Sequence, residues 1–447
     1  MATSLGGGPR PAGSAGSEIS RASLAAAFAA AVGMFVGTTP MIASTQSLFM
    51  GPLEAEFGLS RTLVSIILLS APITVALTGP FGGRLIDRFG VRAIALPVVF
   101  AFALVNALMS VTVAVWQVMA CFILLGACGS VHSYPAYTKV VATWFKRNRG
   151  LVTALMIACG SSFGSILMPH VVADLIEAGG WRSAYLAMAA IVGLFGLPIL
   201  FLFLKENKAG KAPVSAEGAA PEADIAASAA GAVEHERDAV ASDSAYEGVT
   251  RSQALRTRTF WTIFFGLSLS VITLFGTLFH VAPMLGERGL GGSAVATTIS
   301  MFFAGGMMAQ LSVGFLLDRV QTPKVALGFF CFAALGLFML HSATVVFFVY
   351  AGALFMGFAQ GSENTIVSYF ITRYFGLREY NSIYGVTWGM TSMSVVIGSL
   401  GMGAAYDLTG SYDLARFVLP AMMALVVVLF ATLPPYRYAA GRERAGK

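Results

Sequence analysis

Residues 83–92 read Gly83-Arg-Leu-Ile-Asp87-Arg88-Phe-Gly90-Val-Arg92 and form a polar turn between two long apolar runs. A partial copy, Gly314-Phe-Leu-Leu-Asp318-Arg319, follows a later apolar run. Gly83 and Gly314 are 231 residues apart, and so are Asp87 and Asp318. A feature that recurs at one fixed spacing indicates internal duplication, so we predict a chain of two related halves.

The composition is that of a membrane-embedded chain. Of its 447 residues, 57% are hydrophobic and only 11% are charged, and the mean hydropathy is +0.77. Soluble chains carry about 25% charged residues. So few charges predict a surface that faces lipid rather than water. The net charge of +6 is spread between the apolar runs, which argues against a nucleic-acid partner.

Apolar runs long enough to cross a bilayer occur twelve times, since a hydrocarbon core of about 30 Å needs about 20 helical residues. We therefore predict an all-α integral membrane fold with two pseudo-symmetric halves of six transmembrane helices each. The predicted spans are 24–50, 61–83, 93–113, 116–142, 150–173, 183–204, 259–285, 294–317, 324–342, 345–372, 381–405 and 414–433.

The distribution of Lys and Arg predicts the orientation. With both termini in the cytoplasm, four of the 28 basic residues, Arg61, Arg182, Arg288 and Arg416, lie in external loops. Such a bias is typical of cytoplasmic loops. We expect a multi-pass monomer in a plasma membrane, or in the inner membrane of a bacterium, without a cleavable signal peptide.

The predicted spans divide the chain into five segments. The stretch between the halves is rich in Ala, Gly, Asp and Glu, and we predict that it is a disordered cytoplasmic linker. The predicted segments are a tail at 1–22, a half at 23–204, the linker at 205–258, a half at 259–433 and a tail at 434–447.

Residues 83–92 resemble the loop signature of the major facilitator superfamily, and the resemblance extends over essentially the whole chain. It implies a secondary transporter in which this loop stabilises one conformation, with Asp87 as a gate residue. The alternative is a tight turn that only anchors the topology. The residues of this gating motif are Gly83, Asp87, Arg88, Gly90 and Arg92, with Asp318 and Arg319 in the second copy.

Three further stretches, 144–150, 374–378 and 407–412, are similar to the branch of monocarboxylate porters and oxalate/formate antiporters. Anion transporters of that branch place a basic residue in the first, eighth or eleventh span. The corresponding spans here contain no Lys or Arg. The resemblance implies a small organic anion as substrate, but the binding mode of those transporters does not carry over directly.

Glu363 is the acidic residue that falls inside a predicted span rather than in a cytoplasmic or external segment. It lies near the middle of span 345–372, where an ionisable side chain costs roughly 2.5–3.5 kcal/mol on insertion scales. Burial favours its neutral form, so a carboxyl that changes protonation as the site opens could carry a proton. The alternative is a protonated structural acid bonded to a neighbouring helix.

His132 lies 231 residues before Glu363, so the duplication predicts equivalent depths for the two. We expect His132, Tyr134, Tyr137 and Lys139 to face Glu363, Asn364 and Gln360 across a central cavity. His132 could instead be a packing residue. Lys139 and Arg373 could extend to the cytoplasmic surface instead of binding a substrate carboxylate.

The remaining candidates for substrate binding are polar residues in other spans. His280 lies near the predicted external mouth and is a candidate gate residue. Side-chain packing between helices is the alternative for the uncharged ones. These are Thr45, Gln46, Asn106, Gln310 and Trp388.

We predict a proton-coupled carrier that moves a small organic anion, a monocarboxylate or an aromatic acid, by alternating access. The alternative is a drug or metabolite exporter of the same fold, working as a proton antiporter. Protons, substrate and membrane lipid are the expected partners. The sequence contains no nucleophile elbow, phosphate-binding loop or metal-ligand spacing, so we expect neither an enzyme nor a bound cofactor or metal.

Overall fold

The computed structural model describes residues 20–132, 134–145, 149–206, 248–320, 322–376 and 378–438. These residues form helices and connecting turns. The β-structure among them is an isolated bridge between Gly248 and Gly376. The prediction of an all-α fold is confirmed.

The N-terminal half consists of helices that are interrupted several times. Its elements are α1 (Arg21–Phe35), η1 (Thr39–Ala43), η2 (Gln46–Phe49), α2 (Met50–Phe57), α3 (Arg61–Phe89), α4 (Val91–Met109), α5 (Val115–Gly129), α6 (Tyr134–Trp144), α7 (Arg149–Ile157), η3 (Ala158–Ser162), α8 (Phe163–Ala190), η4 (Ile191–Gly196) and α9 (Leu197–Phe203).

The C-terminal half is built of long, uninterrupted helices. Its elements are α11 (Arg251–Leu255), α12 (Arg258–Gly286), α13 (Gly292–Arg319), α14 (Lys324–Ser342), α15 (Val346–Phe375), α16 (Tyr380–Thr409) and α17 (Asp413–Ala431).

Eight stretches of the described chain are long and apolar enough to cross a membrane. One of them, Gly150–Phe203, turns sharply at Gly180, whose φ of 78° is readily adopted only by glycine, and so holds two crossings. Helix α5 followed by α6, and the 30-residue helices α15 and α16, have the length of further crossings but are shorter or more polar. This pattern agrees with the predicted twelve spans.

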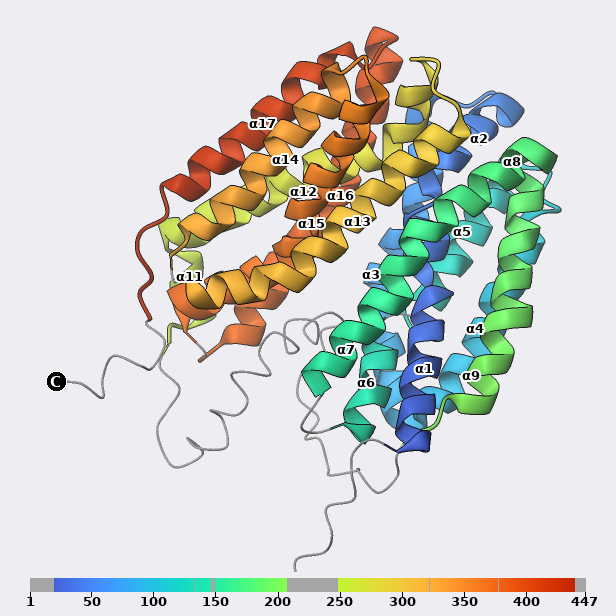
Figure 1. The fold of residues 1–447 in the computed structure, drawn as a ribbon, viewed down its shortest axis with the longest axis horizontal. Coiled ribbons are helices and arrows are strands. Elements are labelled where there is room, and N and C mark those ends of the chain that lie inside the picture. The colour runs from blue at the N-terminus through green and yellow to red at the C-terminus, as the bar shows by residue number, and fades with distance from the viewer. Residues whose placement is uncertain are drawn as a thin grey trace, which may run out of the picture.

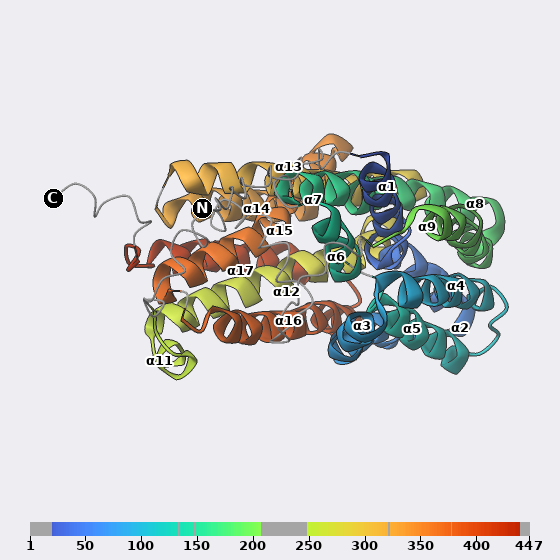
Figure 2. The same cartoon turned by 90° about the horizontal axis from the view of Figure 1, so that it is seen from below.

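The two halves meet at one end of the bundle and diverge toward the other (Figure 1). Figure 2 shows the same two groups of helices from below, side by side. We name the end that carries α2 and the start of α3 the α2 end. The opposite end, where residues 206 and 248 lie, is the linker end.

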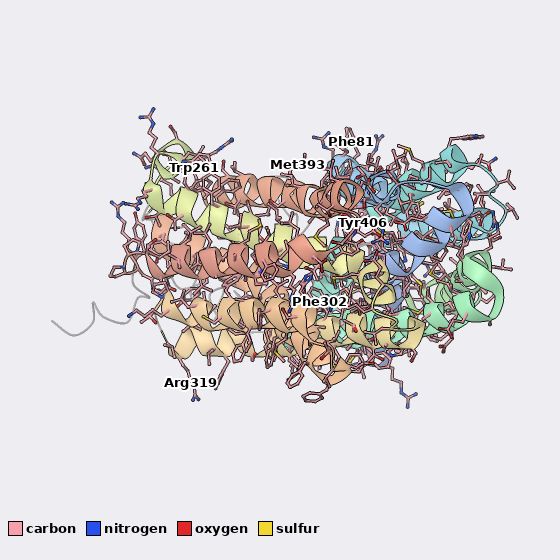
Figure 3. The ribbon with its side chains drawn as sticks, turned by 90° about the horizontal axis from the view of Figure 1, so that it is seen from above. Phe81, Trp261, Phe302, Arg319, Met393 and Tyr406 are labelled. Carbon is pink, nitrogen blue, oxygen red and sulfur yellow. The ribbon has the colours of Figure 1, made fainter. Side chains whose placement is uncertain are left out.

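Apolar side chains cover the outside of the bundle, as expected of a surface in lipid. Phe81 and Met393 project from the outer surface, whereas Phe302 lies within the bundle (Figure 3). Inside the C-terminal half, glycines let α13 and α15 approach closely, because a Cβ at Gly361 would overlap the carbonyl of Gly306. The result is a tightly packed pair of continuous helices.

The last residues of the predicted linker 205–258, from 248 onward, are described by the structure and pack against the C-terminal half. The Val249 N–H donates to the carbonyl of Phe375 at 2.9 Å, and the Thr250 side chain caps the short helix α11. The C-terminal half therefore begins near residue 248 rather than at 259, because these contacts hold the segment against α15. Residues 207–247 lie outside the described part of the chain.

The predicted tails are described only in part. Residues 434–438 of the C-terminal tail follow α17, and the Tyr374 hydroxyl donates to the carbonyl of Pro434 at 2.6 Å. This contact attaches the start of the tail to α15. Residues 1–19 and 439–447 are outside the described ranges.

Candidate functional site

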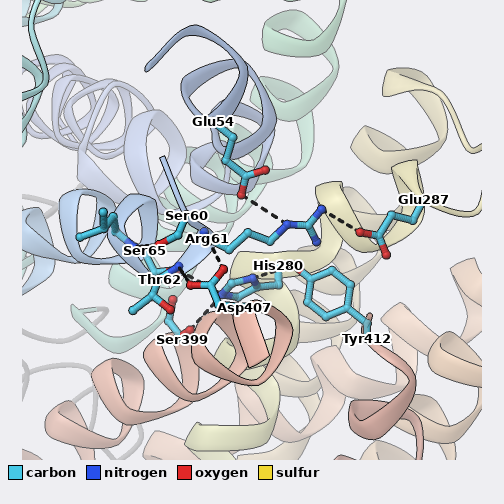
Figure 4. Close-up of polar contacts among 11 residues, drawn as sticks. Glu54, Ser60, Arg61, Thr62, Ser65, His280, Glu287, Ser399, Asp407 and Tyr412 are labelled. Carbon is cyan, nitrogen blue, oxygen red and sulfur yellow. Dashed lines mark hydrogen bonds and ion pairs between the residues drawn. The ribbon is translucent and has the colours of Figure 1, made fainter. Parts of the chain in front are cut away.

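At the α2 end, Arg61 joins the two halves. Its guanidinium contacts Glu54 of the same half at 3.4 Å and Glu287 of the other half at 2.7 Å. The same group lies 3.4 Å from the ring centroid of Tyr406, which adds a cation–π contact between the halves. Figure 4 shows Arg61 between Glu54 and Glu287, with Asp407 beside the start of α3. We call Glu54, Arg61, Glu287 and Asp407 the Arg61 cluster.

Asp407 binds the N-terminus of a helix that belongs to the other half. Its two carboxylate oxygens accept from the backbone N–H groups of Arg61 and Thr62, each at 3.1 Å. These are the first residues of α3, where helical N–H groups lack partners and a negative charge is favoured. Burial raises the pKa of Asp407, but hydrogen bonds from Thr62 and its neighbours outweigh burial and hold it below the ordinary aspartate range.

His280 is the buried histidine beneath this cluster. Its Nε2–H donates to the carbonyl of Ser399 at 2.9 Å and lies 3.2 Å from the Ser65 hydroxyl of the other half. Nδ1 therefore accepts from the Tyr412 hydroxyl at 2.9 Å. The ring is fixed from both sides, so His280 belongs to the contact between the halves; its role as a gate residue stays a prediction.

A second contact between the halves lies further into the bundle. The Ser300 hydroxyl of α13 donates to the carbonyl of Ile166 at 2.6 Å. His170 of α8 lies 3.2 Å from both Ser300 and Thr297. These hydrogen bonds between the two halves, like those of the Arg61 cluster, fall on the side of the α2 end.

At the linker end, polar groups bind within their own half. Lys139 pairs with Asp87 at 2.5 Å, and both side chains are exposed, by 39% and 61%. The Arg92 guanidinium donates to the carbonyl of Phe201 at 2.7 Å. Glu206 accepts from the backbone of Val91 at 2.6 Å. Nothing in these contacts holds the two halves together.

The gating-motif residues accordingly lie at the end where the halves diverge. Gly90, with a φ of 87°, ends α3 and starts α4. Arg88 lies over the ring of Phe89, and Gly83 is half-buried in α3. In the second copy, Arg319 lies over Phe315, whereas the side chain of Asp318 is outside the description.

His132 lies where the fourth span is interrupted between α5 and α6. Its Nε2 is 2.9 Å from the carbonyl of Val36, and its Nδ1 is 2.6 Å from the Tyr137 hydroxyl. Tyr134 bonds to Ser161 at 2.6 Å. These residues border a cavity of about 20 Å³ inside the N-terminal half.

Glu363 is buried in α15 and points into the C-terminal half. Met356 and Phe370 lie seven residues on either side of it, so the three share one face of the helix. Phe370 contacts Phe430 of α17, and Met356 packs near Gly336 of α14. His132 and Glu363 therefore do not face each other in this conformation, because each points into its own half.

The other candidates of the C-terminal half are placed differently. Gln360 and Asn364, four residues apart, are half-buried on another face of α15, with Gln360 against Gly306. Arg373 lies at the linker end, where its guanidinium contacts Tyr369. Gln310 is half-buried in α13. Trp388 is in α16, and its side chain is among those not described.

The candidates in spans one and three are buried in the N-terminal half. The Thr45 hydroxyl donates to the carbonyl of Met41 at 2.8 Å, and the Asn106 amide to that of Phe102 at 2.8 Å. The amide nitrogen of Gln46 and the amide oxygen of Asn106 have no hydrogen-bond partner among the described residues.

Sequence reasoning missed the Arg61 cluster. From the sequence, Arg61 was one of the external basic residues that indicate the orientation, and Asp407 was part of the stretch 407–412 that resembles a transporter branch. The available indication was the group of charges in the loops that flank spans one, two, seven and eleven. Their pairing could not be deduced, because it depends on which loops of the two halves meet.

Comparison with known proteins gives matches over nearly the whole chain. The sequence model of the Major Facilitator Superfamily matches residues 22–399 and 292–446. A gallate transporter of Pseudomonas putida is 27% identical over 403 residues, covering 85% of this chain and 86% of that protein. An oxalate:formate antiporter of Oxalobacter formigenes is 22% identical over 404 residues (86% and 85%). A 4-hydroxybenzoate transporter of Pseudomonas aeruginosa is 23% identical over 403 residues (86% and 88%).

Proposed function

The chain belongs to the major facilitator superfamily, and on that premise we propose that it carries aromatic carboxylates across the membrane by alternating access, coupled to protons. Membership and the transporters among its relatives make it a multi-pass transport protein rather than an enzyme. The resemblance inferred from residues 83–92 and the related stretches is thereby confirmed.

The observation that carries the proposal is the asymmetry between the two ends of the bundle. The Arg61 cluster and His280 join the halves at the α2 end, whereas Asp87 and Lys139 bind within one half at the linker end. In transporters of this architecture, substrate binds between the halves and access alternates as one half rocks against the other. The structure corresponds to a conformation closed at one end.

The chemistry of the relatives supports the substrate class. Gallate, 4-hydroxybenzoate, oxalate and formate are all carboxylates, and two of the four are aromatic. The gallate transporter has the highest identity of these three relatives. We therefore assign an aromatic monocarboxylate as the preferred substrate.

Glu363 supports proton coupling. Its carboxyl is buried in the C-terminal half, and no Lys or Arg among the described residues forms an ion pair with it. An isolated charge is costly in such a place, so the protonated form is favoured while the site is closed from water. Exposure to water on one side would release the proton there.

The orientation follows from the basic residues of the loops. The ends of the helices at the linker end carry most of the Lys and Arg, which favours the cytoplasm for that end. In the conformation described here the α2 end would then be closed to the outside, and the linker end, where the halves diverge, would face the cytoplasm.

Uptake by purified protein in liposomes tests the proposal. With the outside more acidic than the inside, we expect saturable accumulation of radiolabelled 4-hydroxybenzoate, and collapse of the pH gradient by a protonophore should abolish it. Absence of uptake and exchange for every aromatic and aliphatic carboxylate tried would overturn the substrate class.

Glu363→Gln tests the coupling separately. The variant should exchange labelled for unlabelled substrate across the membrane, because exchange needs no net proton movement, but the pH gradient should no longer drive accumulation. Asp413→Asn is the matched control, because Asp413 is at the start of α17 and contacts Ser411. Full gradient-driven accumulation by Glu363→Gln would refute the coupling role of Glu363.

A further inference from the structure

Three interrupted segments of the N-terminal half meet around the small cavity near His132. The π-helix η1 interrupts span one, the break between α5 and α6 interrupts span four, and the π-helix η3 interrupts span five. Such irregular turns within helices are frequent at functional sites. The cavity is lined by Met34, Thr38, His132, Tyr134, Tyr137 and Ser161, among others.

Glycines allow these segments to approach closely. A Cβ at Gly33 would overlap the ring of Tyr137, and a Cβ at Gly160 would overlap the carbonyl of Ala31. The ring of Tyr137 is fully buried as a result. Its hydroxyl group therefore has little freedom, and its position beside the cavity is set by the backbone.

The contacts of His132 determine its tautomer. Nε2 lies 2.9 Å from the carbonyl oxygen of Val36, which can only accept, so Nε2 carries a proton. A doubly protonated ring would be a buried cation, and no described carboxylate lies within ion-pair distance of it. His132 is therefore neutral, and Nδ1 is an acceptor.

The tautomer in turn directs the hydroxyl of Tyr137. Because Nδ1 accepts, the Tyr137 hydroxyl donates its proton to His132 across 2.6 Å. Phe102 packs edge-on against the His132 ring, with centroids 5.4 Å apart, and keeps the imidazole in place. The Tyr137 oxygen can then offer only lone pairs to a group in the cavity.

The size of the cavity limits what can use these lone pairs. Its volume of about 20 Å³ is enough for one water-sized group, which needs about 10–15 Å³. A carboxylate is larger and has only acceptor oxygens, so it would meet the Tyr137 oxygen without a proton between them. A hydroxyl group is small enough and brings the required proton.

We propose that this cavity is a subsite that receives a hydroxyl group on the ring of an aromatic acid, with the oxygen of Tyr137 as its acceptor. The proposal rests on the proposed transport of aromatic carboxylates and adds a selection for hydroxylated ones. Of the residues that line the cavity, Thr38 and Tyr134 are half-buried and Tyr137 is fully buried, so the ring hydroxyl reaches the Tyr137 oxygen when the segments around the cavity move apart. His132 is a positioning residue, since it acts through Tyr137.

Competing uptake of 4-hydroxybenzoate and benzoate by the protein in liposomes tests the subsite. The two acids differ by one hydroxyl group, and a single well-formed hydrogen bond is worth up to about tenfold in affinity. We expect wild-type kcat/KM to be about tenfold higher for 4-hydroxybenzoate, chiefly through KM.

Two variants show whether Tyr137 is responsible. Tyr137→Phe should bring the kcat/KM ratio of the two acids close to one. Tyr185→Phe is the matched control, because Tyr185 is a buried tyrosine of the same half that packs on Phe49 away from the cavity. It should keep the wild-type ratio. Should Tyr137→Phe not fold, Ser161→Ala alters the same cavity and should also lower the ratio.

The outcomes separate this inference from the function beneath it. Equal kcat/KM for the two acids in the wild type, or an unchanged ratio in Tyr137→Phe, overturns the subsite while leaving carboxylate transport intact. Failure of the wild type to transport either acid overturns the proposed function and the subsite with it.

Discussion

The two ends of the bundle use the same kinds of residue in opposite ways. At the α2 end, Arg61 of one half binds Glu287 of the other, and Asp407 binds back to the N-terminus of α3. At the linker end, Lys139 and Asp87 form a comparable ion pair inside one half. Contacts between halves can stabilise a conformation, whereas contacts within a half move with it. For the two halves to rock, the contacts between them at the α2 end must therefore break.

Burial makes this contrast larger. The Arg61 side chain is 12% exposed, whereas Asp87 is 61% exposed. Exposed ion pairs contribute about 0.2–1 kcal/mol, while hydrogen bonds to partly buried charges contribute about 1.5–3 kcal/mol. The closed α2 end should therefore dominate the balance between conformations.

Arg61→Ala should produce the largest effect. The variant loses its contacts to Glu287 and to Tyr406, so the α2 end should open more often. A reporter cysteine at the buried position 300, in a chain whose four natural cysteines are replaced, should react with an impermeant maleimide about tenfold faster or more.

Arg182→Ala is the control for charge removal at the same end. Arg182 pairs with Glu56 within the N-terminal half, so labelling at position 300 should stay near the reference rate. Equal increases in the two variants would contradict a specific role of Arg61 between the halves.

Asp407→Ala should have a smaller effect of the same sign. Loss of a helix cap costs about 0.5–2 kcal/mol, so labelling should rise a few-fold. The pKa of Asp407 is depressed by hydrogen bonds from Thr62 and its neighbours. Its stabilisation is therefore present above the ordinary aspartate pKa of about 4 and lost as pH falls through the depressed value.

The pH dependence gives this prediction its control. Relative to a free thiol at the same pH, which corrects for the loss of reactive thiolate in acid, labelling at position 300 should accelerate below about pH 4 when Asp407 is present and should lack that component in Asp407→Ala. The same acid-induced acceleration in both proteins would assign it to another group.

Lys139→Gln should change little in this conformation, because the exposed pair at the linker end is worth about 0.2–1 kcal/mol. Labelling at position 300 should change less than about fivefold.

Asp87→Asn should slow transport more than Lys139→Gln does, because a gate residue at position 87 would contact the other half once the linker end closes. Equal transport rates in these two variants would remove the gate role from Asp87.

Glu54→Gln should have the smallest effect, and of opposite sign to Arg61→Ala. Burial raises the pKa of Glu54, and Arg61 only partly offsets this. Closure therefore weakens as pH rises through that raised value, and the neutral Gln removes the penalty. Labelling at neutral pH should fall by about twofold, the size typical of a partly exposed charge; a rise would show that Glu54 stabilises the closed end.

The fold could be predicted because its determinants are local or repeated. The apolar runs, the few external basic residues and the 231-residue spacing of Asp87 and Asp318 each act through composition or sequence order. The break between α5 and α6 also has a local sign, since Pro135 follows Gly129 within a predicted span. Helix termini and the ordered residues after 248 required tertiary contacts.

The candidate site could be predicted only in part. Duplication places His132 and Glu363 at related depths, but it does not fix the rotation of a helix about its axis. Met356, Glu363 and Phe370 share one face by their spacing, but the burial of that face in the C-terminal half is seen only in the structure. The closeness of Tyr137 to His132 depends on the broken helix and could not be read from order alone.

Distances between spin labels on the two halves test alternating access most directly. One pair of labels, at Val113 and Val345, reports on the α2 end, and another, at Leu151 and Lys324, reports on the linker end; all four side chains are exposed. A ligand shifts the balance only if it binds the two conformations differently. With aromatic carboxylate and an acidic medium, a second population should appear in which the α2-end distance lengthens while the linker-end distance shortens. Distances that stay single and unchanged at both ends, in a preparation that transports, would contradict exchange between two conformations.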